Sequence, residues 1–330
     1  MSVSSDIRAD GPIGTFYGLE VHSRLPFRFL RSGTGIPMLV TEAASTHGEP
    51  DGELLMEWPA RGNGSASRLY RDALGAHLWI DRIGCFDIDA KEPSITIPEL
   101  PSEEVRSELS PTVPEEQLLA WRETFVLGPP ATVCFMAQGY LPIHAASVDV
   151  GGAGILLGAP GTFGKTTLSG AFHNAGHRLL SDDISACGLD GHPTVYPGPA
   201  LLRVRRDVFN NVDFSASEVA FETEFRVALS IDPSRRGDAR PVPLRAIVLL
   251  GRSDGELSLT RADPADAIRD LFNLSFKSIL DRGRAFEDVA KLVKAVPVWY
   301  LARRLDYGEL PEVVDRVVTE CLAPTSAKGG

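Results

Sequence analysis

A glycine-rich segment that follows a short apolar stretch has the residue types needed to bind phosphate. It runs Gly158-Ala-Pro-Gly-Thr-Phe-Gly-Lys-Thr-Thr, so Gly164, Lys165 and Thr166 match the Gly-Lys-Ser/Thr end of a Walker A loop. Ala159 stands where that pattern has its first glycine. Such a loop wraps backbone N–H groups around phosphate oxygens, and the N-terminus of the next helix adds positive partial charge. The segment therefore predicts a nucleotide-binding loop.

The side chains of this loop have distinct expected tasks in binding ATP. Lys165 would reach the β- and γ-phosphates, and the Thr166 hydroxyl would hold Mg²⁺. Phe163 is bulky for such a loop and would either stack on a ligand or seal the loop. The alternative is a glycine-rich turn between a strand and a helix, with an ordinary surface lysine. The residues predicted to contact the nucleotide are Ala159, Pro160, Gly161, Thr162, Phe163, Gly164, Lys165, Thr166 and Thr167.

Two adjacent carboxylates follow the loop. Asp182 and Asp183 come 17 and 18 positions after Lys165, at the end of an expected strand. Adjacent strand residues point to opposite sides, but bending at a strand end can bring both to the phosphate site. One carboxylate would then accept a substrate proton and the other would hold metal. Two acids this close to the loop favour a compact kinase, and a pair of solvated acids in a turn is the alternative.

Histidine and arginine residues nearby are further candidates. His144 lies before the strand that leads into the loop, although a lone histidine more often packs in a core than catalyses. Arg203, Arg205 and Arg206 form a basic cluster after the aspartates, and arginine pairs well with carboxylate and phosphate. The cluster is therefore a candidate contact for the acceptor or the transferred phosphate. A solvated basic face explains it equally well.

The elements that position these residues follow from periodicity and breakers. Alternating short stretches from Phe16 to about Ile97 predict strands and hairpins, and the proline-bearing run from Pro98 to Pro114 predicts a connection. Around the loop we expect a strand at 155–157, a helix at 166–174 ending at Gly176, and a strand from Arg178 into the aspartates. Strand, loop, helix and strand form the unit that puts a phosphate site at a sheet edge. Further helices are expected at 115–127, 131–138, 264–272, 286–293 and 310–321, and further strands at 244–251 and 296–305.

Composition limits the class of protein. The chain has 330 residues, of which 43% are hydrophobic, enough for one large or two moderate domains. The net charge of -11 argues against nonspecific nucleic-acid binding. The apolar runs are far shorter than the roughly 20 residues of a membrane-spanning helix, and the polar N-terminus lacks a secretory signal, so we expect a cytoplasmic protein with no membrane partner. Four dispersed cysteines predict buried free thiols.

From His144 to Asp183 the order and spacing resemble the HPr kinase/phosphorylase family. The shared features are the histidine, a strand, the phosphate loop, a short helix ending at Gly176-His-Arg, and the Asp182-Asp183 pair. The wider pattern is more similar to the HPr-kinase-related proteins found with lasso-peptide biosynthesis. It includes Tyr17-Gly-Leu-Glu-Val-His-Ser near the start and Val296-Pro-Val-Trp-Tyr-Leu near the end.

The resemblance implies an α/β fold, with a P-loop kinase domain of the HPr kinase type after a smaller β-rich domain. Under this division residues 1–114 form the β-rich domain, 115–323 the kinase domain and 324–330 a disordered tail. The resemblance further implies that Asp182 takes a proton from a serine hydroxyl, that Asp183 and Thr166 hold Mg²⁺, and that His144 supports Asp182. Together with Lys165, Asp182 and His144 are the expected catalytic residues.

The sequence departs from true HPr kinases in two ways. Thr167 stands where they have glutamate, and no segment corresponds to their downstream Glu-Ile-Arg-Gly-Leu-Gly. We therefore expect the acceptor to be a serine near the C-terminus of a lasso-type precursor peptide, or another serine-bearing molecule. A small-molecule hydroxyl kinase and a nucleotide-binding regulatory module without turnover remain alternatives. Whether the chain forms a homo-oligomer is left open.

Overall fold

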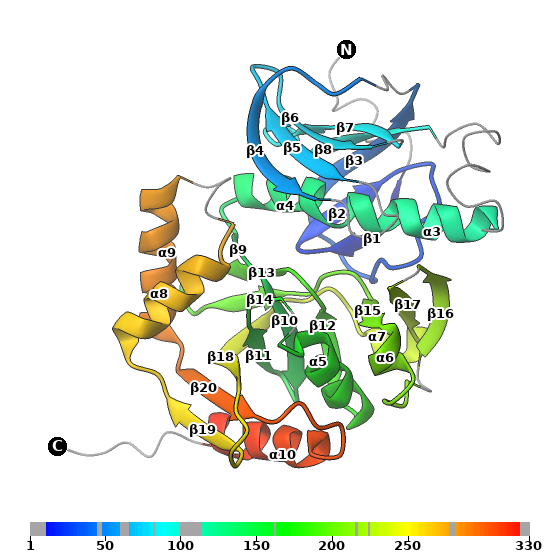
Figure 1. Ribbon diagram of the computed structural model, residues 1–330. Coiled ribbons are helices and arrows are strands. Elements are labelled where there is room, and N and C mark those ends of the chain that lie inside the picture. The colour runs from blue at the N-terminus through cyan, green and yellow to red at the C-terminus, as the bar shows by residue number, and fades with distance from the viewer. Residues whose placement is uncertain are drawn as a thin grey trace.

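The computed structural model describes residues 11–44, 48–59, 66–81, 83–99, 114–161, 163–214, 217–223, 225–276 and 281–323. Thr162, the tail at 324–330 and most of the connection predicted before Pro114 lie outside these residues. The described part has a mixed α/β fold with several sheets (Figure 1).

The first sheet contains the strands predicted between Phe16 and Ile97. Its order is β1-β2-β3-β8-β7-β6-β5-β4. Alternation explains the burial, because Phe86 and Ile88 point into the core while Asp87 and Asp89 are exposed. The strands are β1 Pro12–Phe16, β2 Leu19–His22, β3 Ile36–Ala43, β4 Glu53–Trp58, β5 Ser67–Arg71, β6 Ala76–Ile80, β7 Gly84–Asp89 and β8 Ser94–Pro98.

Two helices lie between the first sheet and the rest of the molecule (Figure 1). They are α3 Glu115–Val126 and α4 Pro129–Ala137, so both helices predicted in this region are confirmed. The α4 helix opens on Pro129 and Pro130, which the first turn tolerates because its N–H groups have no helical partner. Side chains of both helices join the hydrophobic core of the first sheet. The hydrophobic core of the first sheet therefore includes residues after position 114, which were assigned from the sequence to the kinase domain.

The second sheet carries the glycine-rich loop. Its main path is β12-β10-β11-β18-β14-β13-β9, with β20 beside β18 and β19 beside β20. The predicted apolar strand at 244–251 is the buried centre of β18, which pairs in parallel with β11 and β20. The strands are β9 Leu141–Ile143, β10 Ala145–Val150, β11 Ala153–Gly158, β12 Arg178–Ser181, β13 Ser185–Gly188, β14 Thr194–Tyr196, β18 Val242–Arg252, β19 Ser258–Arg261 and β20 Val298–Arg303.

The strand that leads to the aspartates is not a direct neighbour of the strand that leads into the loop. Strand β12 pairs with β10, which separates it from β11. It also ends at Ser181, so residues 182–184 form a turn before β13 and not one continuous strand. Because β10 runs antiparallel to both neighbours, β11 and β12 run parallel. Their carboxyl ends therefore share a sheet edge with the amino end of β10.

Helices cover both faces of the second sheet. The core on one face includes side chains of α5 Lys165–Asn174 and α10 Leu310–Cys321. The core on the other face includes side chains of α8 Pro264–Leu274 and α9 Arg282–Ala295.

A small sheet of order β15-β17-β16 completes the fold. Its strands are β15 Leu201–Arg205, β16 Ser217–Glu222 and β17 Arg226–Ile231. The remaining helices are α6 Arg206–Phe209 and α7 Pro233–Arg236.

Two buried side chains from the region of the first sheet form hydrogen bonds with segments in and next to the second sheet. The Arg31 guanidinium donates from Nε to the Gly198 carbonyl at 2.8 Å and from Nη2 to the carbonyls of Leu179 and Leu180 at 2.8 and 3.2 Å. The Tyr17 hydroxyl donates to the Ile184 carbonyl at 2.8 Å. Three of these four bonds end on β12 or on the turn that follows it, so the first sheet contacts the segment that carries the aspartates.

Candidate functional site

The glycine-rich loop connects β11 to α5. Gly164 has φ of 83° in the left-handed region, and the helix begins at Lys165 directly after it. A side chain at Gly164 would also clash, since an added Cβ would lie 2.7 Å from Nη2 of Arg303. At the far end of α5, Gly176 has φ of 94°, which confirms the predicted glycine at the helix end. Glycine is thus required by geometry at both ends of this helix.

The Lys165 ammonium lies inside the loop. Its Nζ donates to the Ala159 carbonyl at 2.8 Å and contacts the Pro160 carbonyl at 3.4 Å. Burial lowers the pKa of Lys165, while Asp183 and Asp182 act in the opposite direction. The lysine charge is therefore within electrostatic reach of both carboxylates.

The Asp182 carboxyl is buried against Thr166. Its Oδ2 accepts the backbone N–H of Arg203 at 2.8 Å, whereas Oδ1 is buried without a hydrogen-bond partner among the residues that the structure describes. Burial and the neighbouring Asp183 raise the pKa of Asp182, and the Thr166 hydroxyl partly offsets this. A buried carboxylate oxygen without a partner is costly, so a ligand that completes it is expected at this position.

The Asp183 carboxyl has different surroundings. Its Oδ2 accepts Nη2 of Arg203 at 2.8 Å and its Oδ1 lies 3.5 Å from Nε2 of His144. The side chain is 43% exposed. Burial opposes ionisation, but Arg203, His144 and Lys165 hold the pKa of Asp183 below its ordinary value. The two aspartates thus have pKa values pushed in opposite directions, which is typical of groups with different tasks.

His144 lies between β9 and β10, with its backbone N–H bonded to the Leu274 carbonyl at 2.8 Å. Burial lowers the pKa of His144, although Asp183 partly opposes this effect. The neutral imidazole is therefore the favoured form at neutral pH. Its side chain is 40% exposed, so it also faces the open side of the site. His144 contacts Asp183 and not Asp182, contrary to the role implied by the resemblance.

The structure divides the predicted arginine cluster. Arg203, on β15, is the member that contacts the aspartates. Arg205 instead pairs with Asp207 through two bonds at 2.8 and 2.9 Å, and Arg206 pairs with Glu222 at 2.7 Å. Arg205 is the last residue of β15 and Arg206 the first of α6, and each pairs with an acidic side chain other than the two aspartates.

Arg226 is a site residue that sequence reasoning missed. Its Nη1 donates to the Arg203 carbonyl at 3.3 Å. Its positive charge acts on His144, Lys165 and Asp183. Arg226 begins β17, outside any motif, and the pairing of β15 with β17 brings it to the site. Nothing in its local sequence signals this position.

A basic pocket of about 510 Å³ lies beside the loop. Phe163, expected to stack on a ligand or seal the loop, packs on the hydrophobic core with the Arg252 guanidinium 5.1 Å from its ring centroid. Arg303, 1% exposed, packs against Gly164. The pocket is lined by Arg252, Ser253, Asp254, Arg303, Arg304, Leu305, Asp306 and Tyr307.

The donor set fits Mg²⁺ and a polyphosphate. Mg²⁺ prefers oxygen ligands, which the Thr166 hydroxyl and the Asp182 carboxylate supply. Among the described residues, Oδ1 of Asp182 accepts no hydrogen bond, so its lone pairs are free to coordinate a cation. The loop amides, Lys165 and the N-terminus of α5 supply positive charge for phosphates.

No protein-family model matches this chain, and no curated protein matches it either. Among solved structures, the chain is similar to the HPr(Ser) kinase/phosphatase from Coxiella burnetii, with 13% sequence identity and a TM-score of 0.30. That similarity covers 54% of this chain and 93% of the other. In the part of the chain that the structure describes, no helix is long and apolar enough to cross a membrane. The serine acceptor and the lasso-peptide association remain predictions.

Proposed function

We propose that this protein is an ATP-dependent kinase that transfers the γ-phosphoryl group to a serine hydroxyl. One observation carries the proposal: the phosphate loop, the Asp182-Asp183 turn and His144 meet at a single edge of the second sheet. Phosphoryl transfer requires positioning and charge neutralisation more than covalent chemistry, and these residues supply both.

Lys165 and the loop amides would hold the β- and γ-phosphates. Thr166 and Asp182 would hold Mg²⁺, because the buried Oδ1 of Asp182 has no partner within the described ranges and the Thr166 hydroxyl acts on the same carboxyl. When bound, Mg²⁺ neutralises negative charge on the phosphates. The raised pKa of Asp182 does not oppose this role, since a bound cation favours the charged carboxylate.

Asp183 is then the group that would accept the proton of the acceptor hydroxyl. Its side chain is 43% exposed, whereas Asp182 is 8% exposed and faces inward. His144, at 3.5 Å, would stabilise the charge on Asp183 and orient it. This division is opposite to the one implied by the resemblance, in which Asp182 is the base and Asp183 holds the metal. The contacts of Asp182 with the loop side of the site are the reason for the change.

The proposed acceptor is a flexible peptide with a serine near its C-terminus, of the lasso-precursor type. Arg203 is 33% exposed and Arg226 adds a second positive charge at the same edge. Two guanidinium groups can attract a terminal carboxylate, and they favour a free acid over an amide.

Peptides of one sequence test this proposal. A serine-containing peptide with a free C-terminus, the same peptide amidated, and a serine-to-alanine peptide are incubated with ATP and Mg²⁺ and analysed by mass spectrometry. We expect phosphorylation of the first, a higher KM for the second and no product from the third. Equal KM values for acid and amide would reject carboxylate recognition. Rapid phosphorylation of free metabolites with no peptide product would indicate a small-molecule kinase instead.

A further inference from the structure

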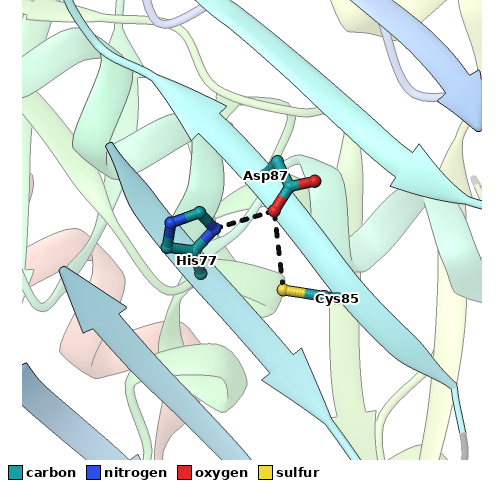
Figure 2. A group of neighbouring side chains, drawn as sticks. All are labelled: His77, Cys85 and Asp87. Atoms are coloured by element: carbon teal, nitrogen blue, oxygen red, sulfur yellow. Dashed lines mark hydrogen bonds and ion pairs between the residues drawn. The ribbon is translucent and has the colours of Figure 1, made fainter. Parts of the chain in front are cut away.

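Three potential metal ligands meet on the first sheet, away from the nucleotide loop. They are His77 on β6 and Cys85 and Asp87 on β7, and their ligand atoms all lie within 4.8 Å of one another. Figure 2 shows His77 and Cys85 both directed at one oxygen of Asp87. That oxygen, Oδ1, lies 2.7 Å from Nδ1 of His77 and 3.6 Å from Sγ of Cys85.

Strand register fixes this arrangement. In the antiparallel pairing of β6 with β7, His77 stands opposite Asp87, and Cys85 precedes Asp87 by two residues on the same face. The other face carries Leu78, Phe86 and Ile88, which are buried in the core. The three donors therefore lie on two paired strands, and not on a loop, and the opposite face of these strands packs in the hydrophobic core.

A second carboxylate lies close to the other ring nitrogen of the histidine, without forming a hydrogen bond to it in the metal-free structure. Asp72 places Oδ1 at 3.2 Å from Nε2 of His77, on the ring edge opposite Asp87. Asp72 itself accepts the backbone N–H groups of Leu74 and Gly75 at 2.7 and 3.1 Å. In metal sites a ligating histidine usually donates its other ring N–H to such a carboxylate, which fixes the tautomer and the ring orientation. Here that contact would leave Nδ1 as the ligating atom, facing Asp87 and Cys85.

We propose that Nδ1 of His77, Sγ of Cys85 and a carboxylate oxygen of Asp87 form a zinc site, with Asp72 positioning His77. Nitrogen, sulfur and oxygen donors together suit Zn²⁺, whereas Mg²⁺ and Ca²⁺ require mainly oxygen. Water would take the fourth position. The site has one cysteine, so it carries no paired-cysteine signature in the sequence.

One separation between ligand atoms already has the value of a tetrahedral zinc site, and a second must grow to reach it. Zn–N, Zn–O and Zn–S bonds of about 2.0 to 2.3 Å separate neighbouring ligand atoms by about 3.4 to 3.6 Å. The separation between Sγ of Cys85 and Oδ1 of Asp87 already has this value, at 3.6 Å. The separation between Nδ1 of His77 and Oδ1, now 2.7 Å, must grow by roughly 0.7 Å. Asp87 can supply that movement because its side chain is 59% exposed.

Binding would replace hydrogen bonds by metal bonds. The metal-free Cys85 is a thiol that donates to Oδ1 of Asp87. Zinc would bind the thiolate, and the thiol proton would leave to solvent. No electron transfer takes place, and no second reactant is required.

Titration of the metal-depleted full-length protein with Zn²⁺ and with Co²⁺ tests the site. We expect one equivalent of each to bind, and the cobalt form to show a sulfur-to-cobalt charge-transfer band. The Cys85→Ser variant should lose this band, whereas Cys321→Ser, which changes another buried free thiol, should keep it. Asp72→Asn should weaken zinc binding by about 10- to 100-fold.

If the Cys85→Ser variant does not fold, the Asp87→Asn variant tests the site instead, because Asp87 is exposed and its replacement is compatible with folding. We expect it to lose most of the zinc affinity while ATP binding stays unchanged. The proposal is overturned if the parent binds no zinc, if the cobalt spectrum lacks a sulfur band, or if Asp87→Asn and His77→Gln bind zinc as tightly as His192→Gln, which alters an exposed histidine.

Discussion

Nε2 of His144 lies 3.5 Å from Oδ1 of Asp183, while the adjacent Asp182 turns away, toward Thr166 and the backbone N–H of Arg203. Neighbours in the sequence thus face two sides of one site. Asp182 faces the helix that follows the phosphate loop, and Asp183 faces the exposed side where an acceptor would enter. This split is the basis for assigning metal binding to one and proton acceptance to the other.

The two aspartates should respond differently to magnesium. We expect Asp182→Asn to raise the Mg²⁺ concentration needed for half-maximal activity, with part of the activity recovered at high Mg²⁺. Asp183→Asn should lower kcat by roughly a hundred- to ten-thousand-fold at every Mg²⁺ concentration, because it removes a general base. Steady-state kinetics across a magnesium series measures both. If high Mg²⁺ restored activity to Asp183→Asn and not to Asp182→Asn, Asp182 would be the general base and Asp183 the metal ligand.

Replacing Lys165 should abolish transfer. Lys165→Ala removes the charge that pairs with the β- and γ-phosphates, so ATP binding should weaken and product formation should fall to background. Calorimetric titration with ATP and a product assay measure the two effects. Lys291→Ala is the matched control, since Lys291 is 66% exposed on α9 and pairs with Asp288. Unchanged turnover in Lys165→Ala would refute the assignment of the loop.

How far the sequence predicts this structure depends on the range of the contacts. The Walker-type loop, the helix after it and Gly176 are local features, and the structure has all three where periodicity and breakers place them. The insertion of β10 between β11 and β12 was not predicted, because strand neighbours depend on pairing across the sheet.

Side chains brought in from distant segments could not be predicted either. Arg226 reaches the site through strand pairing, and Arg303 reaches Gly164 from the end of β20. The meeting of His77 with Cys85 depends on the register of a hairpin, which a spacing rule for metal ligands does not detect. Arg205 and Arg206 show the converse, since adjacency to Arg203 in the sequence did not bring them to the aspartates.

Tyr17 should influence catalysis from behind the site. Its hydroxyl donates to the Ile184 carbonyl at 2.8 Å, one residue after Asp183. We expect Tyr17→Phe to cost about 1 kcal/mol of stability, the usual net value of one hydrogen bond, and to lower kcat with little change in ATP affinity. Urea unfolding and kinetics measure the two effects.

Tyr300→Phe is the matched control for Tyr17→Phe. The Tyr300 hydroxyl donates to Asp270 at 2.6 Å, on the α8 side of the second sheet. Its loss should affect stability to a similar extent and leave kcat unchanged. Equal effects of the two variants on kcat would show that Tyr17 contributes only to stability.

Stability should fall as pH rises through the pKa of Glu123. Burial raises the pKa of Glu123 to about 7 from an ordinary value of 4.5, although the backbone N–H groups of Arg28 and Phe29 favour its charged form. Because folding raises its pKa, Glu123 binds its proton more tightly in the folded protein than in the unfolded chain. Its contribution to the free energy of unfolding is therefore complete below pH 4.5 and is lost as the pH rises through 7. Its size is on the order of 3 kcal/mol.

Thermal unfolding at a series of pH values measures this effect in the parent and in Glu123→Gln. We expect the variant to lose part of the decline in Tm between pH 4.5 and 7, because the neutral amide does not titrate. Glu312→Gln, at an exposed position of α10, should retain the parent profile. Identical profiles for the parent and Glu123→Gln would exclude Glu123 as the cause.

Under the proposed function, the loop, the aspartates and His144 together transfer a phosphoryl group from ATP to serine. The most direct measurement uses ATP labelled in the γ-phosphoryl group, Mg²⁺ and a serine-ended peptide, and it follows the label into the peptide by mass spectrometry. We expect label on the serine oxygen with the parent, none with Lys165→Ala, and roughly a hundredth or less of the parent rate with Asp183→Asn. ATP binding by the parent with no labelled product from any acceptor would refute phosphoryl transfer and indicate a nucleotide-binding module without turnover.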